Sequence, residues 1–471
     1  METTQSKSNG RLIAIIAMFF IFAMISFVTN LAAPIGTIWG NEFEGNSVLG
    51  MMGNMMNFLA YLFMGIPAGN LLVKIGYKKT ALWAMAVGVI GLFVQYLSGV
   101  IGTDTSLFSM TSSIDEGGQM VTKEFVVRLN FFAYLLGAFI CGFCVCMLNT
   151  VVNPMLNLLG GGGNKGNQLL QTGGALNSLS GTLTPLFVGA LIGQLSKSTT
   201  MQAVAPLLFI AIGVFVAAFI VISFVSIPEP NLAKSGAKKV KYSHSPWNFR
   251  HTVLGVIGIF IYVGIEIGIP GTLNFYLADQ KASGAGVIGD ASTIAGAIVA
   301  IYWLLMLVGR SLSGAISGKI STRIQLITVS AVGICLVIAA ICLPKSITVS
   351  VPSFIYSGPA GEIASVPVSA YLLVLCGLCT SVMWGGIFNL AVEGLGKYTA
   401  QASGIFMMMV VGGGVLPLVQ QFIAKEAGYM TSYWLIVACL GYLLIYGLVG
   451  CKNVNTDIPV DLEDELKEEL V

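Results

Sequence analysis

The sequence predicts an all-α membrane protein with twelve transmembrane helices in two pseudo-symmetric six-helix bundles. Hydrophobic residues make up 56% of its 471 residues, charged residues only 9%, and the mean hydropathy is +0.86. A soluble chain of this length would need far more charge to cover its surface. Apolar segments of about 20 residues, the length of a helix that crosses a bilayer, recur along the whole chain. Features of the first half also recur in the second half.

The twelve expected spans are separated by short breaks rich in Gly, Asn, Lys or Pro. The first span follows a short polar head without a small-residue cleavage site, so we expect no removable signal peptide. Three connections are longer: residues 102–128 and 345–365 are polar, and residues 228–250 are basic. The spans lie near residues 12–38, 50–73, 80–101, 129–158, 168–194, 203–226, 251–278, 291–317, 324–344, 366–394, 402–424 and 430–450.

The basic connection divides the chain into two similar halves. We expect an N-terminal bundle (1–227), a cytoplasmic linker (228–250), a C-terminal bundle (251–452) and an acidic cytoplasmic tail (453–471). Such repeats are typical of transporters that hold a substrate between two bundles near the bilayer midplane. The matching features are Gly69, Lys74, Ile75 and Lys78 with Gly314, Lys319, Ile320 and Arg323, and Gly181 and Pro185 with Gly413 and Pro417.

Loop charge predicts the orientation. If both termini are cytoplasmic, 17 of the 23 Lys and Arg lie on the cytoplasmic side. This bias is typical of cytoplasmic loops, so we expect both termini and the linker to face the cytoplasm. The net charge of +2 gives no reason to expect a nucleic-acid partner.

Metal and enzyme chemistry find little support in the sequence. The two histidines, His244 and His251, lie in or beside the linker, and the nine cysteines lie mostly inside spans. The cysteine clusters have no fourth convergent ligand, so packing is the expected role, and no disulfide framework is implied. An intramembrane enzyme would need a second convergent acid, base or metal ligand. We therefore expect no catalytic residue, metal or organic cofactor.

Glu266 is the only acidic residue in the middle of a span. A charge at the bilayer centre costs about 2.5–3.5 kcal/mol on insertion scales, so such a residue usually serves what passes through the membrane. The alternative is a protonated, hydrogen-bonded packing residue. Tyr262, Glu266, Pro270 and Asn274 repeat every four residues and project on one side of span 7. Pro270 should free backbone carbonyls that a cavity can use.

Amide side chains follow the faces of several other spans. Helical periodicity places the members of each set on one face, and amides offer the donors and acceptors that a neutral sugar needs. Hydrogen bonding between helices is the alternative. The sets are Ser26 and Asn30 on span 1, Asn54, Asn57 and Tyr61 on span 2, Asn149, Asn153 and Asn157 on span 4, and Gln171 and Asn177 on span 5.

Aromatic and basic residues complete the predicted site. Trp384, Phe388 and Asn389 on span 10, with Trp303 on span 8, could provide a flat face for a pyranose ring, although packing is an alternative role for each aromatic. We expect Arg310 at the cytoplasmic end of span 8, holding a gate or lipid headgroups. The candidate gating residues are Lys74, Lys78, Arg310 and Lys319.

Several segments carry a resemblance to a known family. The run Gly69–Lys79 resembles the loop 2–3 motif of the major facilitator superfamily. The remaining segments are similar to its fucose–proton symporter family, in particular to the glucose/galactose members. They are Leu148–Pro154, Asn177-Ser178, Tyr262–Ile267, Asn274–Tyr276, Gly309-Arg310, Trp384–Lys397 and Gly412–Pro417. The resemblance implies the major facilitator fold.

The chain departs from that family at charged positions. Val73 replaces the usual Asp of the loop motif. Asn30 and Asn149 stand where fucose-type members carry an Asp and a Glu for proton coupling and substrate binding, and Gly174 replaces a Gln. These departures leave Glu266 as the one mid-membrane group able to bind a proton or a cation.

The sequence thus predicts an alternating-access importer of a neutral monosaccharide, a hexose such as glucose or galactose, coupled to a proton or sodium gradient through Glu266. The resemblance implies a bacterial inner membrane protein, and we expect a monomer in the lipid bilayer. One alternative is a uniporter of a sugar or of another small polar solute. Another is an exporter of lipophilic compounds, which the 20 Met favour and the amides disfavour.

Overall fold

The computed structural model describes residues 2–116, 119–160, 163–192, 199–225, 227, 244–280, 282–316, 320–352, 364–395 and 398–460. Its long helices are α1 (Glu2–Asn30), α2 (Ala32–Glu42), α3 (Ser47–Ser98), α4 (Leu129–Leu159), α5 (Gly163–Ile192), α6 (Ala205–Phe224), α7 (Arg250–Ala278), α8 (Ala291–Ile316), α9 (Thr322–Cys342), α10 (Val368–Val392), α11 (Thr399–Met409), α12 (Gly412–Ala427) and α13 (Tyr429–Ile445).

Within the described residues, eleven helical segments are long and apolar enough to cross a membrane. The predicted fifth span is present as α5, a 30-residue helix with a more polar sequence. The all-α membrane fold predicted from the sequence is therefore confirmed. Of the predicted linker only residues 244–250 are described, and the acidic tail beyond Val460 lies outside the described residues.

Some boundaries differ from the prediction. Spans 2 and 3 are the two legs of α3, between which Gly76 adopts φ 86° and ψ 174°, a conformation open to glycine. Span 1 is interrupted at Leu31, between α1 and α2, and span 11 at Val410 and Val411, between α11 and α12. Both interruptions lie inside apolar spans; Pro34 follows the first within three residues, and Gly412–Gly414 follow the second directly.

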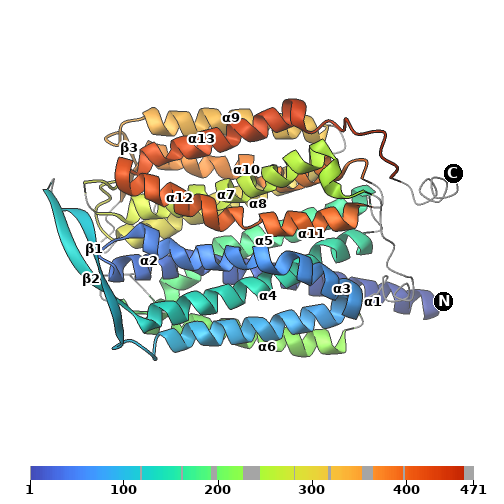
Figure 1. Ribbon diagram of the computed structural model, residues 1–471, viewed down its shortest axis with the longest axis horizontal. Helices are drawn as coiled ribbons and strands as arrows, with labels where there is room; N and C mark the ends of the chain where they lie inside the picture. Colours follow the sequence, from blue (N-terminus) through green and yellow to red (C-terminus); the bar gives the residue numbers. More distant parts are fainter. Residues whose placement is uncertain are drawn as a thin grey trace.

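The axes of the helices are roughly aligned with the long axis of the molecule, and successive spans run in opposite directions (Figure 1). The N-terminus of α1 lies at one end of the bundle, here called the terminus end, and the strands β1 and β2 lie at the opposite end, here called the hairpin end (Figure 1). The N-terminal and C-terminal halves meet where α5 packs against α8, and where α3 packs against α11 and α12.

Two connections that the sequence analysis expected to be only polar loops contain strands. β1 (Ser106–Glu116) pairs antiparallel with β2 (Gln119–Arg128), and β3 (Thr348–Ser350) with β4 (Ser365–Pro367). Two ion pairs attach the first hairpin to α2 and to the turn that follows α2. Nη1 of Arg128 lies 3.3 Å from Oε1 of Glu42 in α2, and Nζ of Lys123 lies 3.7 Å from Oε2 of Glu44 in the turn. The hairpin therefore belongs to the N-terminal half.

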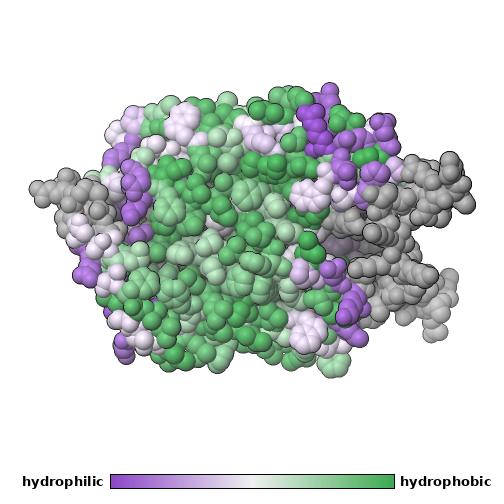
Figure 2. All heavy atoms as spheres, viewed as in Figure 1, coloured by the Kyte–Doolittle hydropathy of each residue, from purple (hydrophilic) through white to green (hydrophobic). Residues whose placement is uncertain are grey.

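On the face that Figure 2 shows, apolar residues cover the middle of the molecule and polar residues are concentrated at both ends. Many large apolar side chains are strongly exposed, for example Phe63, Trp83 and Phe224. A water-soluble protein rarely exposes apolar surface on this scale. Hydrocarbon is the solvent that suits it, so the chain is an integral membrane protein.

Candidate functional site

A cavity, here called the central cavity, lies between the two halves. The space that the centres of water molecules can occupy there is about 40 Å³, enough for a few waters. Both halves contribute to its walls, which combine amides, a hydroxyl and apolar side chains. The lining residues are Thr29, Asn30, Met51, Asn54, Ile267, Pro270, Gly271, Asn274, Phe275, Val299 and Trp303.

Asn54 is buried in the wall of this cavity and reaches across to the other half. Its Nδ2 donates to the carbonyl oxygen of Gly413 at 3.0 Å. That carbonyl lies four residues before Pro417, which has no N–H to donate within α12. The amide of Asn54 thus satisfies a backbone acceptor that the proline leaves without its helical partner.

Asn30 and Asn274 also line the cavity. The Nδ2 atom of Asn30 donates to the backbone oxygen of Ser26 at 2.9 Å and to its Oγ at 3.2 Å. Asn274 donates across the halves to Oγ1 of Thr37 at 3.2 Å. Among the amides proposed from the sequence, Asn30, Asn54 and Asn274 are brought together, and Trp303 lies beside them.

Glu266 forms an ion pair that the sequence analysis did not predict. Its Oε1 lies 3.1 Å from Nη2 of Arg310, and the two side chains are only 14% and 11% exposed. Nη1 of Arg310 donates to the carbonyl oxygen of Gly174 at 2.7 Å and to Oγ of Ser178 at 2.8 Å. The buried Tyr262 lies next to this pair. Arg310 therefore pairs inside the bundle, six residues before the last residue of α8, whereas the sequence analysis expected it at the cytoplasmic end of that helix.

The pair lies outside the lining of the central cavity, toward the terminus end. Gly181 of α5 marks the cavity level, because a Cβ atom there would lie 3.1 Å from Nδ2 of Asn30 and 3.4 Å from the ring of Trp303. Ser178 and Gly174 come one and two turns earlier in α5, which runs from the terminus end. Arg310 therefore contacts α5 on the side of the cavity that faces the terminus end.

Pro270 leaves a backbone carbonyl without its helical donor, but another side chain, not the central cavity, satisfies that carbonyl. The carbonyl oxygen of Glu266, four residues earlier, accepts from the hydroxyl of Tyr302 at 3.2 Å. That hydroxyl also bonds Oγ1 of Thr380 at 2.9 Å, and both residues are buried. The carbonyl that Pro270 leaves unpaired in α7 is thus satisfied by α8, with α10 of the same half contributing Thr380. The sequence shows the proline but not this partner.

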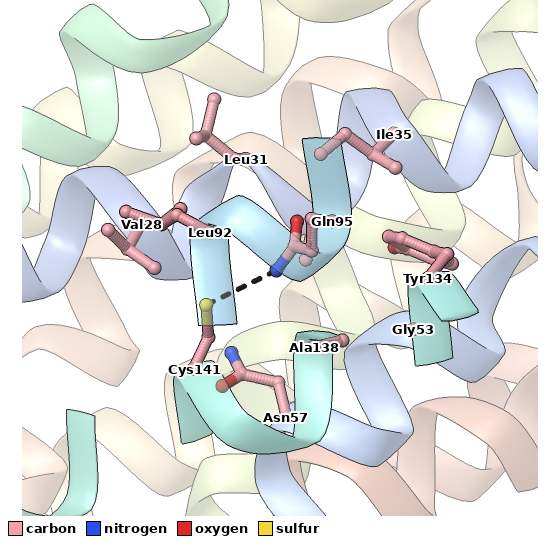
Figure 3. A pocket seen from close by; sticks show the side chains of 11 residues that line it. Val28, Leu31, Ile35, Gly53, Asn57, Leu92, Gln95, Tyr134, Ala138 and Cys141 are labelled. Carbon is pink, nitrogen blue, oxygen red and sulfur yellow. Dashed lines mark hydrogen bonds between the residues drawn. The ribbon is translucent and has the colours of Figure 1, made fainter. Parts of the chain in front are cut away.

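Asn57, one turn from Asn54, lies in a different place. It lines a smaller space inside the N-terminal half, here called the inner pocket, together with Gln95, Tyr134 and Cys141 (Figure 3). Water centres can occupy about 20 Å³ there. The amide of Gln95 donates to Sγ of Cys141 at 3.3 Å (Figure 3). Asn57 therefore lines a different space from Asn54, with which the sequence analysis grouped it.

The amides on α4 and α5 bond protein groups instead of lining the central cavity. Asn149 donates to the Tyr61 hydroxyl at 2.9 Å, Asn153 donates to the backbone oxygen of Asn149 at 2.9 Å, and Asn177 donates to the backbone oxygen of Phe22 at 3.2 Å. All three are half-buried. Two of these bonds join neighbouring helices, the alternative that the sequence left open.

The remaining predicted residues are scattered. Trp384 is half-buried against Tyr262, with ring centroids 6.1 Å apart, whereas Asn389 is exposed. Lys74 is exposed, and Lys78 donates to the backbone oxygen of Ser223 at 2.8 Å within the N-terminal half. The side chain of Gln171 and all of Lys319 lie outside the described residues.

Sequence reasoning missed part of the site. It did not single out Met51, Gly271 or Phe275 as lining residues, although Gly271 next to Pro270 is a signal of close approach. A Cβ at Gly271 would lie 3.4 Å from Cε of Met51 in the other half. Within the described residues no group of His, Cys, Asp and Glu is arranged to hold a metal ion.

Comparison with known sequences identifies the family. Residues 15–418 match the Major Facilitator Superfamily. The chain belongs to this superfamily. Its members are transporters, not enzymes.

Two curated relatives match this transporter over nearly its full length. It is 30% identical to the glucose/galactose transporter of Brucella abortus over 96% of its own length and 97% of that protein. It is 24% identical to the L-fucose-proton symporter of Escherichia coli, with 91% and 90% covered. The resemblance found in the sequence is thereby confirmed.

A solved structure supports the same fold. The crystal structure of the Escherichia coli fucose:proton symporter matches this transporter with a TM-score of 0.63 at 18% identity, covering 92% of this chain and 98% of that one. At this identity the likeness establishes the fold alone.

Proposed function

We propose that this transporter imports a neutral monosaccharide by alternating access, and that a hexose such as glucose or galactose is its substrate. The observation that carries the proposal is the composition of the central cavity. Asn30, Asn54 and Asn274 can exchange hydrogen bonds with sugar hydroxyls, and the ring of Trp303 can pack against the apolar face of a pyranose. Among the described residues, none that lines the cavity is charged, which suits a neutral solute.

The relatives favour the same substrate class. The Brucella abortus protein is named a glucose/galactose transporter, and the Escherichia coli protein an L-fucose-proton symporter. The departures at Asn30 and Asn149, where fucose-type members carry acids, favour the first substrate over the second. A lipophilic export substrate would find amides in the wall that it could not pair with.

Coupling to a proton or sodium gradient is proposed to run through Glu266. The carboxylate is buried and balanced by Arg310, so a proton or a sodium ion would have to compete with the guanidinium for it. Uniport is the alternative, in which the Glu266–Arg310 pair keeps its charge balance throughout the cycle. We further propose a monomer in a bacterial inner membrane, with both termini cytoplasmic.

Uptake into proteoliposomes tests the proposal. Purified protein should take up radiolabelled glucose or galactose faster than protein-free liposomes, and an imposed proton or sodium gradient should drive accumulation of one of them. The exposed Asn389→Ala variant serves as a control that should keep full activity. Uptake of neither hexose, or equal inhibition by unrelated polar solutes, would refute the substrate assignment. Equilibration without accumulation under either gradient would establish uniport.

A further inference from the structure

Hydrogen bonds join the two halves on both sides of the central cavity. Glu266, Pro270 and Asn274 follow one another along one side of α7, and Pro270 lines the cavity. At 1.5 Å of helical rise per residue, Glu266 and Asn274 lie about 6 Å to either side of it. Toward the hairpin end, Asn274 bonds Thr37 of α2. Toward the terminus end, Arg310 beside Glu266 bonds α5.

The two closures differ in chemistry. The bond between Asn274 and Thr37 joins two neutral groups at 3.2 Å. The bonds from Arg310 to Gly174 and Ser178 are shorter, 2.7 and 2.8 Å, and their donor is charged. Hydrogen bonds from a charged donor are roughly twice as strong as neutral ones. The terminus end is therefore closed more tightly by polar contacts than the hairpin end.

We propose that Arg310 is a latch that closes the terminus end of the cavity, that Glu266 is the positioning residue that holds the latch extended, and that Asn274 with Thr37 closes the opposite end. The inference rests on the proposed alternating access. In this proposal Arg310 acts inside the bundle, through its bonds to α5. The sequence analysis had instead expected a gate at the cytoplasmic end of the helix.

The latch can open without leaving a buried charge unpaired. Glu266 and Arg310 both belong to the C-terminal half, so their pair can stay intact while the halves separate. Of the hydrogen bonds that Arg310 makes, only those to Gly174 and Ser178 of the N-terminal half must break. A buried unpaired charge would make opening very costly. The pair avoids that cost, and opening the latch exchanges the two hydrogen bonds from Arg310 to α5 for hydrogen bonds to water.

Spin-label distances measured without sugar test the latch directly. One pair of labels reports on the terminus end and one on the hairpin end, each pair spanning the two halves at exposed positions. The exposed thiols of Cys335 and Cys342 are first replaced by serine. The labelled positions are Lys79 with Ile324, and Thr105 with Thr348.

Arg310→Gln should lengthen the terminus-end distance and raise the ratio of open to closed molecules there by about tenfold or more, the effect of losing charge-assisted bonds. Glu266→Gln should have the opposite effect and lower the ratio of open to closed molecules, because breaking the bonds to α5 would then leave the Arg310 guanidinium without a charged partner. Asn274→Ala should lengthen the hairpin-end distance instead. Arg323→Gln is the matched control, because Arg323 bonds the backbone oxygens of Gly447 and Leu448 within one half.

Unchanged terminus-end distances in Arg310→Gln, or equal lengthening in Arg323→Gln, would overturn the latch. If Arg310→Gln does not fold, Ser178→Ala removes one of the two acceptors while keeping the ion pair, and it must shift the same distance in the same direction. Because no sugar is present, the latch can fail while hexose transport stands. It can equally hold in a protein that moves a different solute.

Discussion

Asn54 and Asn57 offer a matched pair of substitutions on one helix. Each is 5% exposed, and one turn of α3 separates them, yet Asn54 lines the central cavity and Asn57 the inner pocket. Asn54→Ala leaves the Gly413 carbonyl and a sugar hydroxyl without a partner. Leaving a buried polar group unpaired costs about 1–3 kcal/mol, which weakens hexose binding by about 5-fold to 150-fold. Asn57→Ala should leave hexose binding unchanged.

Binding of radiolabelled galactose and glucose to purified protein measures both variants, with thermal unfolding as a check on folding. The reasoning fails if Asn57→Ala weakens binding as much as Asn54→Ala does while unfolding at the wild-type temperature. It also fails if Asn54→Ala binds normally, because the central cavity would then not hold the sugar.

Three further changes have definite expected outcomes. Glu266→Gln should abolish gradient-driven sugar accumulation in proteoliposomes while downhill exchange partly remains; a variant that still concentrates sugar shows that Glu266 is not the coupling site. Trp303→Ala should weaken binding by about 0.5–1.5 kcal/mol or more through loss of the stacked face, and normal affinity would limit Trp303 to packing. A cysteine placed at the exposed Leu107 should react with an impermeant reagent in intact cells, and one at the exposed Trp247 should not; the reverse pattern would invert the proposed orientation.

The sequence was sufficient for the architecture. Apolar length predicted the spans, and the repeat of Gly181 with Pro185 at Gly413 with Pro417 indicated two similar halves. What it could not predict were features set by neighbouring helices. The β1–β2 hairpin, for example, is attached to α2 through Arg128 and Glu42.

The candidate site could be predicted only in part, because periodicity assigns a residue to a face but not to a neighbour. Asn54 and Asn57 project only about 60° apart around α3, yet one meets the other half and one meets α4. Asn149 lies on a consistent face of α4, but Tyr61 of α3 occupies that face and takes its hydrogen bond. The contacts of Arg310 could not be predicted for the same reason: its distance from the helix end does not reveal that its guanidinium would pair with Glu266 and bond α5.

Two prolines show how the same local rule has different consequences for transport. Pro270 and Pro417 each leave the carbonyl four residues earlier without a helical donor. Tyr302, which donates to the first carbonyl, belongs to the same half, so this hydrogen bond can remain when the halves move apart. Asn54, which takes the carbonyl of Gly413, belongs to the opposite half. When α3 and α12 separate, that bond must break, and both Asn54 and the Gly413 carbonyl then face the cavity where a sugar hydroxyl or water can pair with them.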